Sequence, residues 1–506
     1  MRALVSVYDK TGLLELARGL RSLGWELIAS GKTAAVLDEA GIEAAEVATL
    51  TGAPEMLGGR VKTLHPDVHG AILADRSDPA HLADLEARGI VPIDLVVCNL
   101  YPFGSDPSVE LIDVGGPTMV RAAAKNHAHV GVVVDPADYS GVLEELRASG
   151  SLSEVTRRRL ARAAFAHTAA YDAAIVDWFD RGGAGGEPEL FAPTRHVTLE
   201  RAALLRYGEN PHQRGARYRV VGEPTWWDGV VQHGGTDLSY LNLLDADAAW
   251  RLVGELGGEG QVAAVIVKHA NPCGAALSTD LAAAYRRALE GDPVSAFGGV
   301  VALGGRCTEA VARAVADGPQ ADVVVASSFE AAAVKVLAAR RKATRVLEAP
   351  PHTGSTMELR SVGGGFLVQE ADRFVSDRSD WQVATKTAPT ADQWLDIELA
   401  WRVCARTWSN AVVVAGGGQV LGVGAGQPSR VDAAAIAVNK AGDRARGAAA
   451  ASDAFFPFRD GLDVLAAAGV AAVVQPGGSV RDSEVVAAAD EHGMAMVLTG
   501  ERHFRH

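Results

Sequence analysis

Cysteine is scarce in this sequence of 506 residues, which contains only Cys98, Cys273, Cys307 and Cys404. No two of them form a Cys-x-x-Cys pair, and their irregular spacing excludes a zinc ribbon and a disulfide framework. Unpaired cysteines are typical of a reducing compartment. We therefore expect a cytoplasmic protein.

Basic residues are also few. The sequence has 48 lysines and arginines against 62 acidic residues, which gives a formal net charge of −14. Such a chain is a poor general binder of nucleic acid, because phosphate contacts need a basic surface. No apolar run is long enough to span a bilayer, and the first twelve residues lack the apolar core of a signal peptide. We expect neither a nucleic-acid nor a membrane partner, although local sites for small anions remain open.

Hydrophobic residues make up 48% of the sequence, enough for a large buried core. In the first part, short apolar runs at 3–7, 25–29, 94–100 and 129–134 alternate with helical patterns, which is typical of a parallel sheet with helices on both faces. A long helix predicted over 153–179 is followed by the run RGGAGGEPE, which cannot hold a helix. We place the domain boundary there, giving domains 1–190 and 191–506. The second part has predicted strands at 262–267, 411–415, 420–423, 470–474 and 494–498, and its length indicates two lobes.

The segment Ser30-Gly31-Lys32-Thr33 follows a predicted strand and opens a predicted helix. It resembles the end of a P-loop, but that motif needs a glycine at position 26, where this sequence has Glu26. A P-loop ATPase is therefore disfavoured. Free N–H groups at the start of the helix can hold an anion, although an ordinary Ser/Thr cap gives the same pattern.

Three further segments of the first part carry polar residues at informative spacing. Arg60 and Lys62 alternate, so they share one face of an extended chain. Tyr101 follows the carboxyl end of a predicted strand, where ligands bind in open α/β sheets. Lys125 lies on a helix that begins at Gly-Gly-Pro-Thr after Asp113. Each pattern taken alone also fits a solvated surface.

In the second part, the most apolar strand ends abruptly in Lys268-His269. Neighbours on a strand face opposite ways, but in a loop at its end both can point into one site. A core histidine beside a surface lysine fits the same pattern. Farther on, the phenylalanines between 455 and 458 suit a flat ring, although adjacent phenylalanines are more often core.

The order of the motifs is more informative than any one of them. DKTG, SGKT, GRVKTLHP, CNLYPF, IDVGGPT–RAAAKNH, LRYGENPHQ, KHANPCG, SAFGG, GAGQPSR, SDAFFPFRD and RHFRH follow one another from residue 9 to residue 506. This series resembles the bifunctional purine-biosynthesis family that joins phosphoribosylaminoimidazolecarboxamide formyltransferase to IMP cyclohydrolase. The resemblance covers essentially the whole chain.

The resemblance implies an α/β protein with a methylglyoxal-synthase-like N-terminal domain, which closes the purine ring to IMP. The C-terminal part would be a pair of cytidine-deaminase-like lobes without zinc. These lobes would transfer a formyl group from 10-formyltetrahydrofolate, as co-substrate, to 5-aminoimidazole-4-carboxamide ribonucleotide. The family is usually a homodimer with the formyltransferase site at the subunit interface. We expect no transition metal, while a structural monovalent cation is left open.

The resemblance also implies roles for individual residues. For ring closure, the catalytic positions are Lys62, Tyr101, Asp113 and Lys125, and the nucleotide-binding positions are Ser6, Lys10, Ser30, Gly31, Lys32, Thr33, Arg60 and Thr63. For formyl transfer, the catalytic positions are Lys268, His269 and Asn410. The nucleotide- or folate-binding positions there are Arg206, Tyr207, His212, Phe297, Arg430, Phe455, Phe456, Phe458 and Arg502.

Two residues depart from the family pattern. Lys32 stands where many relatives have glycine, and it would either add a phosphate contact or crowd the site. Trp408 stands where relatives usually have lysine or glutamine, so a substrate contact would be altered if its side chain faces the site. The competing interpretation is a nucleotide-binding regulatory protein without turnover, and the intact Lys268, His269 and Asn410 argue against it.

Overall fold

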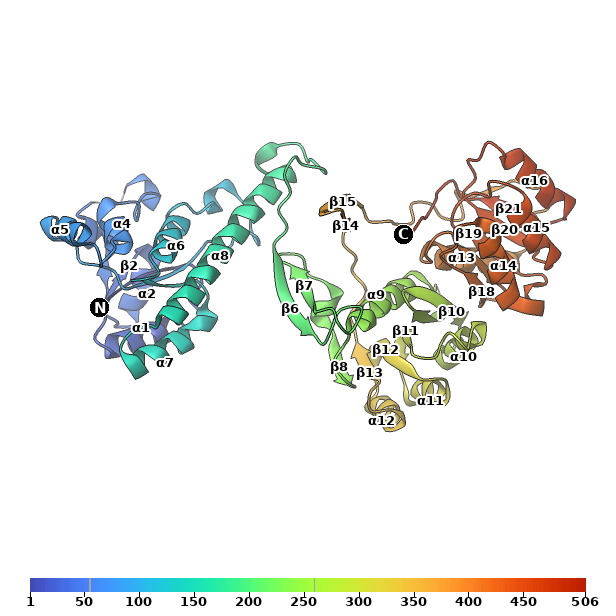
Figure 1. Ribbon diagram of the computed structural model, residues 1–506, viewed down its shortest axis with the longest axis horizontal. Helices are drawn as coiled ribbons and strands as arrows, with labels where there is room; N and C mark the ends of the chain where they lie inside the picture. The colour runs from blue at the N-terminus through green and yellow to red at the C-terminus, as the bar shows by residue number, and fades with distance from the viewer. Residues whose placement is uncertain (54–55, 259) are drawn as a thin grey trace. The chain divides into compact units, whose positions relative to one another are not determined.

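The computed structural model describes residues 1–53, 56–258 and 260–506. The chain forms two compact units (Figure 1). The first comprises residues 1–200 with 220–222, and the second comprises 201–219 with 223–506.

A five-stranded parallel sheet lies at the centre of the first unit. Its strands follow the order β3-β2-β1-β4-β5, and every neighbouring pair is parallel. They are β1 (Arg2–Val7), β2 (Glu26–Ala29), β3 (Ala45–Glu46), β4 (Leu95–Asn99) and β5 (Gly131–Val133). The parallel sheet predicted from the sequence is confirmed.

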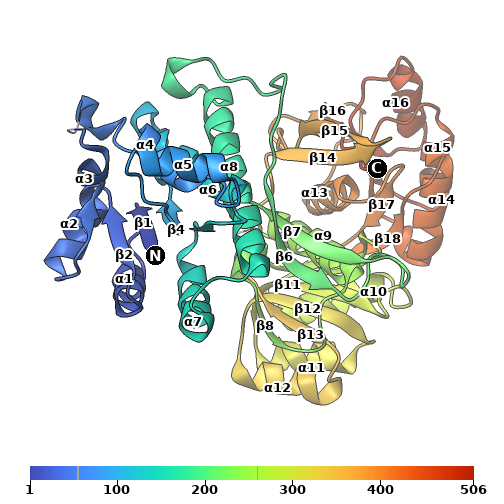
Figure 2. The same cartoon turned by 60° about the vertical axis from the view of Figure 1, so that its left-hand side comes forward.

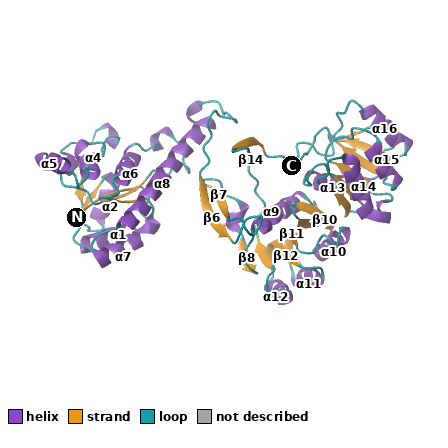
Figure 3. Cartoon of the chain, viewed as in Figure 1, coloured by secondary structure: helices purple, strands orange, loops and turns teal. Residues whose placement is uncertain are grey.

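Helices cover both faces of this sheet (Figure 3). They are α1 (Leu13–Ser22), α2 (Gly31–Glu39), α3 (Val47–Thr51), α4 (Pro66–Leu73), α5 (Pro79–Ala87), α6 (Gly115–Lys125), α7 (Tyr139–Ser149) and α8 (Glu154–Asp180). Successive strand residues enter opposite cores: Leu4 packs in one apolar cluster, while Ala3 and Val5 pack in the other. Both clusters use only residues of this unit.

The second unit has two lobes, each built on a mixed six-stranded sheet. In the first lobe the order is β10-β9-β11-β12-β13-β8. Its strands are β8 (Val231–Gly234), β9 (Val262–Lys268), β10 (Asn271–Ser278), β11 (Gly299–Cys307), β12 (Ala321–Phe329) and β13 (Arg345–Glu348), and its helices are α9 (Tyr240–Glu255), α10 (Leu281–Gly291), α11 (Glu309–Asp317) and α12 (Ala331–Arg340). Strands β9 and β10 are antiparallel and joined by a two-residue turn.

In the second lobe the strand order is β16-β21-β20-β19-β17-β18. Its strands are β16 (Gln382–Val383), β17 (Val412–Ala415), β18 (Val420–Gly424), β19 (Ala449–Ser452), β20 (Ala472–Gln475) and β21 (Ala495–Leu498), and its helices are α13 (Ala391–Ala405), α14 (Arg430–Ala441), α15 (Asp460–Ala467) and α16 (Asp482–Glu491). The strands predicted at 411–415 and 420–423 are confirmed, and they form the antiparallel pair β17–β18.

One apolar cluster joins the two lobes. It includes Ala249 of α9 and Val265 of β9 from the first lobe, together with Ala400 of α13 and Val413 of β17 from the second. Two hairpins complete the unit (Figure 2): β6 (Leu199–Leu205) with β7 (Gly215–Val220), and β14 (Met357–Val362) with β15 (Gly365–Glu370). The shared core fixes the two lobes against each other, so polar segments from both can form one site.

Among the described residues, no helix has both the length and the apolar character needed to cross a membrane. In the same part of the chain, no group of three or more His, Cys, Asp or Glu side chains is arranged to hold a metal ion.

Candidate active sites

In the first unit, polar side chains converge where β1 ends and α2 begins. The hydroxyl oxygens of Ser6 and Ser30 are 2.7 Å apart. The buried Thr33 hydroxyl donates to the Val7 carbonyl at 3.1 Å, and Lys10 Nζ lies 3.3 Å from the same hydroxyl oxygen. The site therefore combines hydroxyl groups and an ammonium group with the start of a helix, an arrangement that suits a phosphate.

Three lysines surround the start of α2. Gly31 has a φ of +43°, and a β-carbon there would lie 2.8 Å from Lys62 Nζ, so only glycine lets this ammonium approach so closely. The pKa of Lys10 lies below its ordinary value, because burial disfavours the charged form and the nearby charge of Lys32 adds repulsion. Lys10 and Lys32 therefore form a region of concentrated positive charge, which an anion would stabilise.

Tyr101 and Asp113 form a second polar group in this unit. Burial raises the pKa of Asp113, although its Oδ1 accepts a 2.8 Å hydrogen bond from the N–H of Gly116. Burial and then the charge of Asp113 raise the pKa of Tyr101. At Gly115 a β-carbon would lie 2.6 Å from the Thr63 hydroxyl oxygen, so the glycine lets the predicted Thr63 approach the start of α6.

Two other predicted residues of this unit lie at its surface. Arg60 is exposed and its Nη2 donates to Glu110 at 2.7 Å. Lys125 is the last residue of α6, ten residues after Gly115, which places it about 15 Å along the helix axis at 1.5 Å per residue. The structure brings together Ser6, Lys10, Ser30, Gly31, Thr33 and Lys62, while the role of Lys125 stays a prediction.

In the second unit, β9 ends at Lys268, and His269 is the first residue of the turn that leads to β10. Lys268 Nζ donates to the backbone carbonyl of Phe297, whose ring is exposed. The side-chain oxygen of Asn271, at the start of β10, accepts a 3.0 Å hydrogen bond from the N–H of Trp408. This contact places the turn of the first lobe beside the segment of the second lobe that contains Asn410.

Asn410 is held by a buried arginine. Arg430 Nη2 donates to Asn410 Oδ1 at 2.7 Å, and Arg430 Nη1 donates to Ser452 Oγ at 2.8 Å and to Asp453. Arg430 is 8% exposed and Asp453 is fully buried. These contacts fix the Asn410 amide with its oxygen toward Arg430 and its nitrogen 2.8 Å from the carbonyl oxygen of Gln427. Arg430 thus orients Asn410, and a direct contact with nucleotide stays a prediction.

A cavity of about 410 Å³ lies beside Asn410. Its lining includes Asn410, Ser429, Arg430, Phe455, Phe458, Arg502 and Phe504. The prediction that Phe456 contacts substrate is wrong, because its ring does not line this cavity and is fully buried in the apolar core. The reason is local, because the N–H of Phe456 donates to buried Gln475 at 2.8 Å and turns this residue inward.

The last residues of the chain complete one wall of the cavity. Arg502 and Phe504 line it, and the Arg502 guanidinium lies 4.4 Å from the centre of the Phe504 ring. Backbone contacts hold the tail: the N–H of Ser409 donates to the Arg505 carbonyl at 2.8 Å, and the N–H of Arg505 donates to Ser409 Oγ at 3.0 Å. The segment leading to Asn410 and the tail are thus tied together.

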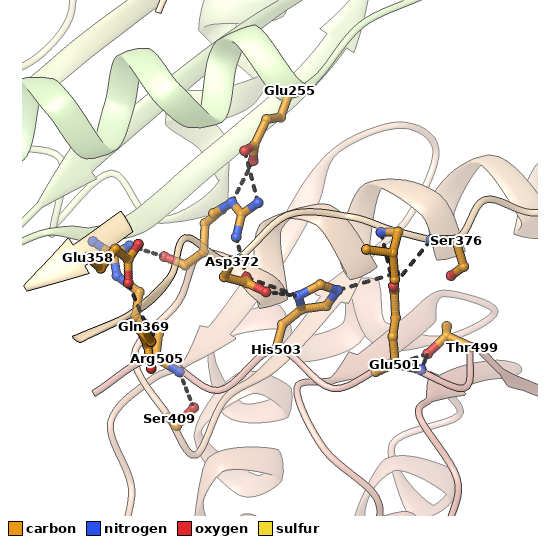
Figure 4. A network of polar contacts seen from close by, with 12 residues as sticks. Glu255, Glu358, Gln369, Asp372, Ser376, Ser409, Thr499, Glu501, His503 and Arg505 are labelled. Carbon is orange, nitrogen blue, oxygen red and sulfur yellow. Dashed lines mark hydrogen bonds and ion pairs between the residues drawn. The ribbon is translucent and has the colours of Figure 1, made fainter. Parts of the chain in front are cut away.

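Between Arg502 and Phe504, His503 points inward and meets Asp372 (Figure 4). Its Nδ1 lies 2.9 Å from Asp372 Oδ1, while its Nε2 lies 3.3 Å from Glu501 without hydrogen-bond geometry. Asp372 also accepts from Arg406 Nη1 at 2.7 Å, and Arg406 in turn donates to Glu255 of α9 at 2.6 and 2.9 Å. We call Glu255, Arg406, Asp372 and His503 the tail clamp, since these side chains connect α9 to the C-terminal tail.

The sequence predictions did not include the tail clamp. The motif RHFRH predicts a role only for Arg502, although its alternating pattern also indicates an inward-facing His503. Residues 502 and 504 line the cavity, whereas residue 503 is buried in the protein. Asp372 lies 131 residues before His503, and no local pattern connects them.

The remaining predicted nucleotide-binding residues stand on the loop between β6 and β7. Arg206 and His212 are exposed, and the Arg206 guanidinium lies 5.5 Å from the centre of the Tyr207 ring. Trp408 is 36% exposed, with the Arg505 guanidinium 5.8 Å from its ring centre.

Two family models match the sequence of this chain. Residues 123–440 match the model of the family described as "AICARFT/IMPCHase bienzyme", and residues 12–127 match the "MGS-like domain". A solved structure titled "Crystal structure of ForH" is 41% identical over 35% of this chain and 98% of that chain, with a TM-score of 0.33. The chain therefore belongs to the AICARFT/IMPCHase bienzyme family, whose members transfer a formyl group from 10-formyltetrahydrofolate to 5-aminoimidazole-4-carboxamide ribonucleotide and close the product to IMP, and it catalyses these last two steps of IMP synthesis.

Proposed function

We propose that the two steps are divided between the two units, with domain limits of 1–190 for ring closure and 191–506 for formyl transfer. The support is that the polar groups described above form one set in each unit, and that each unit has its own apolar core. No polar group of one unit is needed to explain the arrangement of the other.

In the first unit, Ser6, Lys10, Ser30 and Thr33 would bind the phosphate of the formylated nucleotide, and Lys32 would add charge. Ring closure is intramolecular, so holding one conformer removes much of the barrier, by about 7–11 kcal/mol in well-oriented cases. The carboxamide nitrogen attacks the formyl carbon and loses one proton, the formamide nitrogen loses a second as it forms a double bond to that carbon, and the formyl oxygen leaves with two protons as water. Asp113 suits proton removal, because its raised pKa makes the carboxylate a stronger base. Tyr101, Lys62 and Lys125 would stabilise the formyl oxygen.

In the second unit, the amine nitrogen of the substrate would attack the formyl carbon, and His269 would accept the proton that this nitrogen loses. Lys268 would protonate the departing folate nitrogen. The side-chain nitrogen of Asn410 would donate a hydrogen bond to the formyl oxygen. It would give up its 3.2 Å hydrogen bond to the Pro428 carbonyl, which is longer than its 2.8 Å hydrogen bond to the Gln427 carbonyl. The observation that carries this proposal is the contact of Asn271 with Trp408, since it brings the His269 turn and the Asn410 segment together.

We further propose a homodimer in which a second copy brings its loop with Arg206, Tyr207 and His212 to the cavity. The support is that Arg206 and His212 are exposed on the loop of a hairpin, with the half-buried Tyr207 beside Arg206. Phe297, Phe455 and Phe458 would contact folate, and Arg502 the nucleotide. A structural monovalent cation near the C-terminal tail belongs to the same proposal. The four cysteines form no disulfide, which supports a cytoplasmic location.

His269→Ala tests the assignment. We expect formyl transfer to fall by about 10²–10⁴-fold, the usual contribution of a general base. Ring closure in the same polypeptide should be unchanged and serves as the control. Single-turnover formation of tetrahydrofolate at saturating nucleotide is the measurement. A variant that keeps more than a tenth of the wild-type rate would show that the base lies elsewhere.

A further inference from the structure

The turn that carries His269 has an unusual backbone. His269 has a φ of +53° and Ala270 a φ of +57°, and these two residues alone join β9 to β10. Two-residue hairpin turns of this kind require positive φ at both positions and therefore favour Asn-Gly or Gly-Gly. Neither residue here is Gly or Asn, and residues with a β-carbon rarely adopt left-handed values. Something outside the turn must hold it.

Asp245 of α9 makes the contacts that hold it. Its Oδ1 accepts from the N–H of Ala270 at 2.7 Å, and its Oδ2 lies 3.3 Å from the donating N–H of His269. Each carboxylate oxygen thus receives one backbone N–H of the turn. Asp245 is 8% exposed. Its pKa lies above the ordinary value, because the effect of burial exceeds the lowering by the two N–H groups and by the charges of His269 and Lys268.

The helix that presents Asp245 is itself well fixed. A capping box closes its start: the N–H of Asn242 donates to Ser239 Oγ at 3.2 Å, and the N–H of Ser239 donates to Asn242 Oδ1 at 3.1 Å. Farther along, Ala249 and Trp250 are buried in the core shared by the two lobes. The carboxylate therefore stands at a fixed point beneath the turn.

A second side chain holds the opposite side of the turn. Asn271 Nδ2 donates to the His269 carbonyl at 3.2 Å, while its Oδ1 accepts from Trp408. Both peptide groups of His269 are thus engaged, although its side chain is exposed. A ring exposed to solvent can be aimed only by its backbone.

We propose that Asp245 is a positioning residue for formyl transfer: its carboxylate holds the left-handed His269-Ala270 turn and so presents the His269 ring to the amine of the substrate. The inference rests on the proposed role of His269. Asp245 itself does not contact substrate, because both of its oxygens face the backbone of the turn.

Asp245→Asn is the principal test. The asparagine keeps one acceptor oxygen and replaces the other by an NH₂ group, which opposes one N–H of the turn. We expect kcat for formyl transfer to fall at least 10-fold, KM for the aminoimidazole nucleotide to stay within 2-fold, and ring closure to be unchanged. Asp247→Asn is the matched control on the same helix: its carboxylate accepts from Trp226 Nε1 at 2.9 Å, away from the turn, and kcat should not change.

A rescue separates positioning from a general loss of structure. Glycine adopts positive φ freely, so Ala270→Gly should remove part of the need for the carboxylate. We expect Ala270→Gly alone to keep wild-type kcat with an equal or higher Tm. In the Asp245→Asn background it should recover at least half of the lost kcat on a logarithmic scale. A purely structural role for Asp245 would not give this recovery in kcat at constant KM.

The outcomes discriminate between the positioning role of Asp245 and the proposed role of His269 as the base. Wild-type kcat in Asp245→Asn, or a loss that Ala270→Gly does not relieve, overturns the positioning role. If His269→Ala is inactive while Asp245→Asn is fully active, only the positioning role fails. If His269→Ala keeps its rate, the proposed role of His269 fails and this inference with it. Should Asp245→Asn not fold, a lowered Tm in Ala270→Gly alone would contradict the strained turn.

Discussion

At the scale of single residues, the environment of Tyr101 decides what its hydroxyl can do. Burial and the neighbouring Asp113 raise the pKa of the phenol above its ordinary value of 10.0. The phenol is therefore protonated at neutral pH, so it can donate a hydrogen bond there.

We predict that Tyr101→Phe slows ring closure by about 10²–10³-fold, the usual loss for one oxyanion donor. Formyl transfer should be unchanged. In the wild type, the ring-closure rate should show no loss from phenol ionisation up to pH 10, because the shift is upward. Stopped-flow conversion of formylated nucleotide to IMP across pH 6–10 measures both the loss of rate in Tyr101→Phe and the pH dependence of the wild-type rate. A fall in rate with an apparent pKa below 10 that is present in the wild type and absent in Tyr101→Phe would contradict the donor role.

Lys32 is the other informative single residue. Its charge acts on Lys10, yet its own side chain is exposed, so the structure favours an added phosphate contact over crowding. We predict that Lys32→Gly raises KM for ring closure about 2- to 5-fold with unchanged kcat, corresponding to ~0.5–1 kcal/mol for an exposed charge pair. The difference in KM between Lys32→Gly and the wild type should shrink at high salt, because salt screens exposed charges. Lys335→Gly on α12 is the matched control, and a lowered KM in Lys32→Gly would favour crowding instead.

At the scale of elements, the tail clamp connects α9, the segment after β15 and the C-terminal tail. Arg406 is almost completely buried between Glu255 and Asp372, and its pKa is raised by these carboxylates although burial lowers it. Burial raises the pKa of Asp372, but the hydrogen bond and charge of His503 and then Arg406 outweigh it, so its pKa lies below 3.8. The ionised form of Asp372 is thus the one that stabilises the fold.

We predict that Asp372→Asn lowers the free energy of unfolding of the second unit by about 1–3 kcal/mol, the cost of losing hydrogen bonds to a charged group. A depressed folded-state pKa gives stability that is present above the unfolded value and lost as pH falls through the folded value. The difference between wild type and variant should therefore be present at pH 7 and at pH 5 and shrink below pH 3.8. Denaturant unfolding at several pH values measures it. A difference that does not shrink as the pH falls below 3.8 would contradict the ionised clamp.

The elements also show how far sequence reasoning reaches. The parallel sheet, the hairpin β17–β18 and the polar end of β9 follow from apolar periodicity and turn residues, which are local properties. Local patterns could not reveal Asp245, which lies 24 residues before His269 on a helix whose packing decides what it meets. The resemblance implies a substrate contact for Phe456, whereas the local pattern of adjacent phenylalanines favours the core, and the buried ring agrees with the local pattern.

At the scale of the whole molecule, the first unit contains its own core. Both of its apolar clusters are formed by residues between 3 and 178, and Trp178 near the end of α8 packs on Phe103 with ring centres 5.5 Å apart. The glycine-rich run that follows α8 has no regular structure apart from the short 3-10 turn Gly183–Gly185. A cut after residue 190 therefore removes none of the residues that form these clusters.

We predict that a fragment of residues 1–190 folds and converts formylated nucleotide to IMP without folate, at a rate within about 3-fold of the full chain. Its polar groups around α2 and Tyr101 all lie within it, and domains with their own cores usually fold alone. Circular dichroism and IMP formation are the measurements, and Tyr101→Phe in the same fragment is the control for a true site. A fragment that is folded but inactive would show that ring closure needs residues beyond 190, and would overturn the division of the two steps between the units.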